Sequence, residues 1–133
     1  MPVVQVKQID HVTLVVKDLE RSRRFYEEVL GMQLVPRPNF PFDGLWFQAG
    51  ATQIHLILEH EASGPAGERK FPNNPTSRGR HFAFEVNDAQ AATEQLRAHG
   101  ITLAAGPKHR PDGPLQICIL DPDDHLVELF SLV

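Results

Sequence analysis

The sequence is poor in cysteine, in long apolar runs and in basic residues, and each shortage excludes a class of protein. Its single cysteine, Cys118, cannot form a disulfide within the chain, which is typical of a reducing cytoplasm. No apolar run approaches the roughly 20 residues that a membrane-spanning helix needs. The first ten residues have neither the basic start nor the apolar core of a signal peptide. We therefore expect a cytoplasmic protein with no membrane partner.

The charge balance argues against nucleic acid as a partner. Thirteen Lys and Arg against 17 Asp and Glu give a formal net charge of −4, whereas nucleic-acid-binding domains present a basic face. The rest of the composition, 41% hydrophobic and 23% charged over 133 residues, is typical of one globular domain with a sizeable core. We expect its partner to be a small-molecule substrate.

The strongest pattern that is present is an internal repeat. Two stretches, one from His11 and one from His81, each have an apolar run, an aspartate seven residues after the histidine, a helix-like segment and a glycine. The two histidines lie 70 residues apart, and the glycines, Gly31 and Gly100, lie 69 apart. Because a repeat dictates architecture, we treat each copy as one structural module.

Each module is predicted to fold as β-α-β-β-β. The strands are expected at 9–16, 32–37, 45–49 and 53–59, and again at 81–86, 101–105, 115–120 and 125–131. Asp18 and Asp88 are the expected helix N-caps, and a glycine ends each helix. The modules span about 7–60 and 80–133, and residues 60–79 are expected to join them as a long loop. Residues 106–114, with three prolines, are expected to form another loop.

Two side chains in each module are predicted to face a shared site. His11 and His81 stand at matching places in the first strands, and His55 in one last strand corresponds to Glu128 in the other. A pseudo-twofold pairing of the modules would bring these four side chains together. A lone histidine on a strand is more often a core or surface residue than a ligand. Four matched positions, one of them a carboxylate in the apolar run VELF, favour a site instead.

Imidazole and carboxylate groups together suit a divalent transition metal. The subset His11, His81 and Glu128 leaves coordination positions open for substrate, water or dioxygen. His55 would either complete the ligand set or hydrogen-bond a bound ligand. A metal held in this way can polarise a carbonyl or enediolate oxygen, or present an activated water.

The sequence resembles the vicinal oxygen chelate superfamily, also called the glyoxalase/bleomycin-resistance/dioxygenase family. The matching stretches span nearly the whole chain: IDHVTLVVKDLERSRRFYEEVLGM, TQIHLILE, GRHFAFEVND and LDPDDHLVELF. The resemblance implies an α+β fold in which two βαβββ modules form a cupped, mixed eight-stranded sheet with helices on the outside. It implies a divalent metal (Zn, Ni, Mn, Fe or Co) held by His11, His55, His81 and Glu128, and a homodimer.

By its size the chain is expected to be a glyoxalase-I-like lyase or isomerase that chelates the vicinal oxygens of a small substrate to the metal. His55 stands where metal-dependent glyoxalase I typically has an acidic or amide side chain. Glu128 is then the candidate catalytic base, and His55 is either a ligand or an acid–base group beside the metal.

Two other activities stay open. Extradiol-type ring-cleaving dioxygenases use a His, His, Glu triad with an additional histidine nearby, a pattern that His55 could satisfy. An antibiotic-resistance protein, either fosfomycin-modifying or drug-sequestering, is the other alternative. His11 and Thr13 reproduce the His-x-Thr start of fosfomycin-resistance relatives, but the loop KHRPDGPLQ lacks their serines.

The remaining candidates would shape the substrate pocket. Trp46, Phe47 and Phe84 are candidate walls, and Arg78 or Arg80 is a candidate anion contact. Ordinary core aromatics and solvated arginines are the commoner roles of such residues. The loops expected to face the substrate, 36–44, 60–79 and 106–114, carry no decisive motif, so the substrate itself is not specified.

Overall fold

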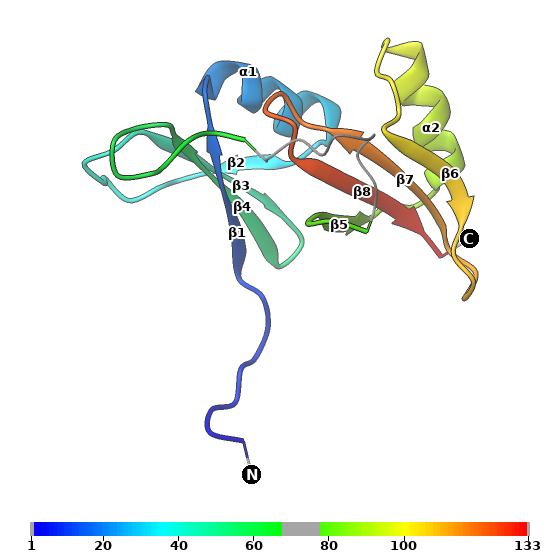
Figure 1. The fold of residues 1–133 in the computed structure, drawn as a ribbon, viewed down its shortest axis with the longest axis horizontal. Helices are drawn as coiled ribbons and strands as arrows, with labels where there is room; N and C mark the ends of the chain where they lie inside the picture. Colours follow the sequence, from blue (N-terminus) through cyan, green and yellow to red (C-terminus); the bar gives the residue numbers. More distant parts are fainter. Residues whose placement is uncertain (1, 68–77, 133) are drawn as a thin grey trace. The chain divides into compact units, whose positions relative to one another are not determined.

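The computed structural model describes residues 2–67 and 78–132, which form eight strands and two helices (Figure 1). In chain order the elements are β1 (His11–Val16), α1 (Leu19–Arg24), β2 (Gln33–Val35), β3 (Gly44–Ala49), β4 (Thr52–Leu58), β5 (Phe82–Glu85), α2 (Ala89–Ala98), β6 (Ala105–His109), β7 (Leu115–Leu120) and β8 (Leu126–Ser131). A π-helical turn, Phe25–Val29, continues α1. Neither helix in this part of the chain has the length and apolar character needed to cross a membrane.

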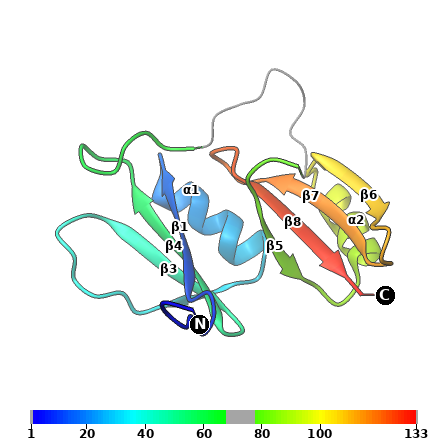
Figure 2. The same cartoon turned by 60° about the horizontal axis from the view of Figure 1, so that its bottom comes forward.

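The chain divides into two compact units, Met1–Gly67 and Glu68–Val133, each with one four-stranded mixed sheet (Figure 2). The strand order is β1-β4-β3-β2 in the first unit and β5-β8-β7-β6 in the second. In both, the first strand runs parallel to the last, and the other pairs are antiparallel. The predicted α+β class with two βαβββ modules is confirmed, and its eight strands form two sheets of four.

The helix in each unit begins at the predicted aspartate. Asp18 accepts a hydrogen bond from an amide of the first turn at 3.0 Å, and Asp88 accepts two at the same distance. These bonds satisfy amides that the first turn of a helix leaves without partners. Gly31 and Gly100 follow the helices with φ of 68° and 76°, the left-handed conformation that glycine adopts without strain.

The core of the first unit lies between the sheet and its helix. Tyr26, Phe47 and Leu56 are completely buried, and the ring centroids of Tyr26 and Phe47 lie 6.0 Å apart. Side chains alternate across a strand, so the same strands must present their other residues on the opposite face. That opposite face carries the candidate site.

The second unit repeats this arrangement with α2. Leu96 of α2 is buried, and Ile117 and Val127 on the sheet are completely buried. The hydroxyl of Ser131, at the end of β8, accepts a hydrogen bond of 2.9 Å from the amide of Ala89, at the start of α2. The end of the sheet is thereby joined to the start of the helix.

One strand lies later in the sequence than predicted. The prediction placed a strand at 101–105 and a loop at 106–114, but β6 covers Ala105–His109 and pairs antiparallel with β7. Pro107 lacks an amide hydrogen, which an edge strand tolerates because one of its sides pairs with no other strand. The pairing is irregular between Ala105 and Lys108, where the proline falls. Pro107 was therefore wrong as evidence for a loop, whereas residues 110–114, which contain the other two prolines, connect β6 to β7 as predicted.

Candidate functional site

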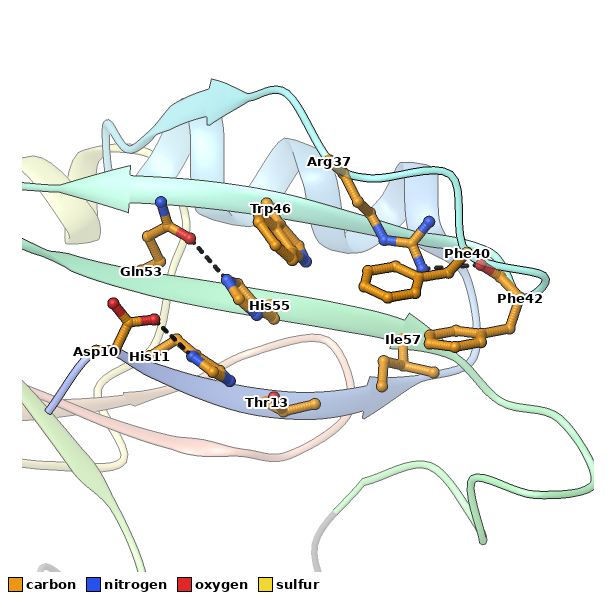
Figure 3. Close-up of a pocket in the computed structure, with 10 residues that line it drawn as sticks. All are labelled: Asp10, His11, Thr13, Arg37, Phe40, Phe42, Trp46, Gln53, His55 and Ile57. Atoms are coloured by element: carbon orange, nitrogen blue, oxygen red, sulfur yellow. Dashed lines mark hydrogen bonds and ion pairs between the residues drawn. The ribbon is translucent and has the colours of Figure 1, made fainter.

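The first unit holds a pocket of about 460 Å³ on the sheet face opposite its helix (Figure 3). Its walls include residues of β1, β3 and β4, and the loop between β2 and β3 closes one end. Small-molecule sites in proteins commonly measure roughly 300–1,000 Å³. The pocket is therefore large enough for a small substrate.

The strand register explains why the candidate residues share this face. His55 on β4 lies opposite Thr13 on β1 and Trp46 on β3, and Gln53 lies opposite His11. Residues paired across neighbouring strands point to the same side of a sheet. The structure thus brings His11 and His55 together on the face that alternation predicted.

His55 lies between two other rings. Its centroid is 3.9 Å from that of Trp46, with planes 2° apart, and 4.0 Å from that of His11, with planes 15° apart. Only 7% of His55 is exposed. Burial, followed by the neighbouring His11, lowers the pKa of His55, so its neutral form is favoured.

Each histidine of this stack has one ring nitrogen beside an acceptor. Nδ1 of His11 is 2.8 Å from Oδ2 of Asp10, and Nε2 of His55 is 2.7 Å from Oε1 of Gln53. In a neutral imidazole, the nitrogen that donates to an oxygen leaves its lone pair on the other nitrogen. His11 therefore offers Nε2, and a carboxylate on Nδ1 is the arrangement that orients histidine ligands of metals.

As the rings stand, His11 and His55 cannot both bind one metal ion. The lone pair of an imidazole nitrogen lies in the ring plane, and a metal–nitrogen bond measures about 2.1 Å. The two planes are nearly parallel and their centroids are 4.0 Å apart. An ion in the plane of one ring would therefore lie well outside the plane of the other.

In the second unit the structure brings together His81 and Glu128. Nε2 of His81 lies 3.5 Å from Oε1 of Glu128, and its Nδ1 lies 2.9 Å from the carbonyl oxygen of Gly79. A carbonyl oxygen only accepts hydrogen bonds, so Nδ1 must carry the hydrogen. Nε2 can then face a carboxylate favourably only if it binds a second proton or a metal ion. Glu128 is only 6% exposed, and a buried carboxylate without a positive partner is costly.

Cys118 on β7 is the register partner of Glu128. Burial, followed by the charge of Glu128, raises the pKa of this thiol to about 11. The thiol is therefore protonated at neutral pH, and Cys118, at 1% exposure, is a buried small residue of the core.

The four predicted ligands thus fall into two pairs, His11 with His55 in the first unit and His81 with Glu128 in the second. Within residues 2–67 and 78–132, no three His, Cys, Asp or Glu side chains gather closely enough to hold a metal ion.

The other histidines have ordinary partners. His60 stacks on Phe42 with centroids 5.5 Å apart, and the buried His125 contacts Asp121 at 2.7 Å. His99 and His109 each place Nδ1 beside a backbone carbonyl oxygen.

Of the residues predicted as pocket walls or anion contacts, only Trp46 is among those that line this pocket. Trp46 lines it, but Phe47 points to the opposite face and belongs to the core. Phe84 lies in the second unit, edge-on to its neighbour Phe82. Arg78 and Arg80 are exposed residues of that second unit. Half of the loop expected at 60–79, residues 68–77, lies outside the described residues.

Three of the pocket residues that were not predicted individually come from a loop. Arg37, Phe40 and Phe42 come from the loop between β2 and β3 and line the pocket. The sequence marked 36–44 as a loop facing the substrate, because its prolines break the chain there. An irregular segment has no periodicity, so nothing in its sequence shows which way each side chain points.

Three known proteins resemble this chain over most of its length. The virulence protein STM3117 of Salmonella typhimurium is 32% identical, with 96% of this chain and 86% of that protein covered. A lactoylglutathione lyase of Haemophilus influenzae is also 32% identical, with 93% and 92% covered. The glutathione transferase FosA of Serratia marcescens is 28% identical, with 93% and 80% covered.

The fold of this chain is also similar to that of one of these relatives. The crystal structure of STM3117 superposes with a TM-score of 0.71 at 28% identity, covering 98% of this chain and all of that one (100%). A sequence model of one superfamily matches residues 8–129, which include every helix and nearly every strand residue described above. The chain belongs to the Glyoxalase/Bleomycin resistance protein/Dioxygenase superfamily.

Proposed function

We propose that this protein is a divalent-metal-dependent enzyme of the glyoxalase type, a lyase or isomerase acting on a small substrate with two vicinal oxygens. Its similarity to a lactoylglutathione lyase supports this class of reaction. The observation that carries the proposal is the contact between His81 and Glu128. Nε2 of His81 faces a buried carboxylate, and a metal ion bound to both would satisfy the nitrogen lone pair and the negative charge.

His11, His81 and Glu128 are the proposed ligands. The two histidines have Nδ1 beside Asp10 and Gly79, so each offers Nε2. Two imidazoles and a carboxylate suit Zn, Ni, Mn, Fe or Co. When bound, the metal would polarise a carbonyl or enediolate oxygen of the substrate.

His55 is proposed to act on the substrate rather than as a ligand. It is held flat by Trp46 and His11, and Gln53 on its Nε2 leaves a lone pair on Nδ1. Its lowered pKa keeps that nitrogen able to accept a proton at neutral pH. Glu128 and His55 are thus the two candidate groups for moving a proton to or from a substrate carbon.

We further propose that the protein is a cytoplasmic homodimer. The single buried cysteine fits a reducing compartment. The ligand pairs belong to different units, so the proposed site would take its ligands from the first unit and from the second unit of the same chain or of a partner. Mixing the His11→Ala and Glu128→Ala proteins distinguishes a site within one chain from a site shared between two chains. A shared site would regain metal in about a quarter of positions after random exchange, whereas a site within one chain would regain none.

A ring-cleaving dioxygenase is the second candidate. The stack on His11 supports a ligand set without His55, which is a two-histidine, one-carboxylate group with a third histidine beside it. Oxygen consumption with a catechol would identify this activity.

A fosfomycin-modifying enzyme is the third candidate. The similarity to FosA and the position of Thr13 beside His55 support it, and thiol transfer to fosfomycin would identify it.

Elemental analysis of protein purified without added metal tests the proposal directly. We expect about one divalent ion per chain, with a loss of affinity of at least tenfold in His11→Ala, His81→Ala and Glu128→Ala. His55→Phe, which keeps the ring stack, and His99→Ala, an exposed control, should retain the metal. Hemithioacetals, catechols and fosfomycin are then screened with the loaded protein. Full metal content in both His11→Ala and Glu128→Ala would overturn the site.

A further inference from the structure

The pocket of the first unit contains an arginine that the proposed metal chemistry does not use. Nη2 of Arg37 donates a hydrogen bond of 2.8 Å to the carbonyl oxygen of Phe42. The guanidinium carbon lies 4.9 Å from the ring centroid of Phe40 and 5.1 Å from that of Phe42. These two rings also stack on each other, 5.2 Å apart. Cation–π contacts and a backbone bond therefore hold the cation in one place.

The sheet leaves room for this cation. Gly44 starts β3, and a Cβ there would first meet the backbone oxygen of Leu56 and would also stand 3.0 Å from both Nε and Nη2 of Arg37. The Leu56 backbone therefore excludes any other residue at this position, and a Cβ would also press on the arginine. The glycine thus lets Arg37 lie close to the sheet, beside the pocket.

The charge of Arg37 is not balanced locally. Within the described part of the chain no carboxylate forms an ion pair with it, whereas Arg23 pairs with Glu27 at 2.9 Å and Arg110 with Asp112 at 2.6 Å. The Phe42 carbonyl accepts from only one of the guanidinium nitrogens. The remaining N–H donors of a guanidinium match the two oxygens of a carboxylate.

We propose that this pocket binds a small monocarboxylate whose charged end pairs with Arg37. Arg37 is the one cationic side chain among the pocket's lining residues, which favours a single negative charge. Trp46 and Ile57 line the pocket nearby and offer apolar surface for the body of the ligand. His11 lies at the other end of the pocket (Figure 3). The identification of this ligand as the substrate rests on the proposed function, but its binding to Arg37 requires no metal.

The test uses a reporter that the chain already contains. Trp46 is the single tryptophan of the sequence and lines the pocket, so its fluorescence reports occupancy. The full chain, treated with EDTA, is titrated with benzoate and phenylacetate and with their neutral counterparts benzamide and phenylacetamide. We expect saturable binding of the carboxylates, at least about tenfold tighter than that of the amides.

Two variants isolate the arginine. Arg37→Met keeps the apolar stem and removes the charge, so carboxylate binding should weaken about 10- to 100-fold while amide binding stays unchanged. Arg37→Lys keeps the charge without the planar guanidinium, so its affinity for carboxylates should lie between those of the wild type and Arg37→Met. Arg97→Met, at an exposed position of α2, is the matched control and should bind as the wild type does. Circular dichroism checks that each variant is folded.

The outcomes separate this proposal from the metal site. Equal affinity for carboxylate and amide, carboxylate binding unchanged in both Arg37 variants, or no saturation up to about 10 mM would each overturn it. Carboxylate binding that is lost with EDTA and returns with metal would place the carboxylate on the metal instead, and would also overturn it. Arg37-dependent binding by a chain that takes up no metal would support this proposal and contradict only the proposed function.

Discussion

His11 and His55 lie face to face, with ring centroids 4.0 Å apart and planes 15° apart. A metal binds an imidazole in the plane of the ring, so this stack separates two roles that the repeat had assigned together. His11 has the orienting carboxylate of Asp10 and is suited to be a ligand. His55 has a buried, neutral ring between two others and is suited to contact the substrate.

Removing the carboxylate beside His11 should weaken metal binding. Asp10→Ala leaves Nδ1 of His11 without its acceptor at 2.8 Å, so the ring and its tautomer are no longer fixed. We expect metal affinity to fall about 10- to 100-fold, measured by competition with a chromogenic chelator. Glu20→Ala, an exposed carboxylate on α1, is the control. An unchanged affinity in Asp10→Ala would show that Asp10 does not orient a ligand.

His55 should make the protein less stable in mild acid. Burial, and then His11, lowers its pKa below the ordinary value of 6.5, so the unfolded chain binds a proton there more readily than the folded one. The neutral His55 therefore contributes to the free energy of unfolding above pH 6.5, and this contribution is lost as the pH falls through the pKa of His55 in the folded protein. Urea unfolding at pH 7.5 and pH 5 should show a smaller loss for His55→Phe than for the wild type. Equal losses in the two proteins would contradict this, and His99→Ala should match the wild type.

Cys118 should resist alkylation in the folded protein. Burial, and then Glu128, raises the pKa of the thiol to about 11 from 9.0, which lowers the thiolate fraction at pH 8 about 100-fold. Mass spectrometry after treatment with iodoacetamide should therefore find labelling at least about 100-fold slower than in urea. Glu128→Gln should label faster than the wild type, since one cause of the shift is gone. Native labelling as fast as in urea would contradict the assignment.

Asp88 should contribute measurably to stability through the start of α2. Its carboxylate accepts two amide hydrogen bonds of 3.0 Å, which Asp88→Ala removes. We expect a loss of about 1 kcal/mol in the free energy of unfolding, measured by urea titration with circular dichroism. Asp88→Asn keeps an acceptor and should lose much less, and Glu94→Ala, on an exposed face of the same helix, serves as control. A loss in the asparagine variant equal to that in the alanine variant would argue against capping.

The fold was predictable where several local signals agreed. Asp18 and Gly31 mark the start and end of one helix, and Asp88 and Gly100 mark those of the other. The strand at 115–120 was predicted with its observed bounds. The error at β6 arose because the signals in the sequence conflicted. Proline usually indicates a turn, and only the three-dimensional structure shows that Pro107 lies in an edge strand, where proline is tolerated.

The site was less predictable than the fold, for a physical reason. Alternation along a strand shows that His11 and His55 share a face, but it does not set the rotation of their rings. That rotation depends on Trp46, Gln53 and Asp10, which pack or bond against them. A sequence also cannot show where a loop side chain such as Arg37 will lie. The grouping of His11, His81 and Glu128 around one metal stays a prediction, and a ligand role for His55 would require its ring to leave the stack.

The π-helical turn after α1 accounts for the unequal spacing of the repeat. Asp18 and Gly31 are 13 residues apart, whereas Asp88 and Gly100 are 12 apart. The amide of Leu30 donates to the carbonyl oxygen of Phe25, five residues earlier, so the turn accommodates one residue more than an α-helical turn would. The first copy therefore accommodates, inside its helix, one residue more than the second copy has between its cap and its glycine.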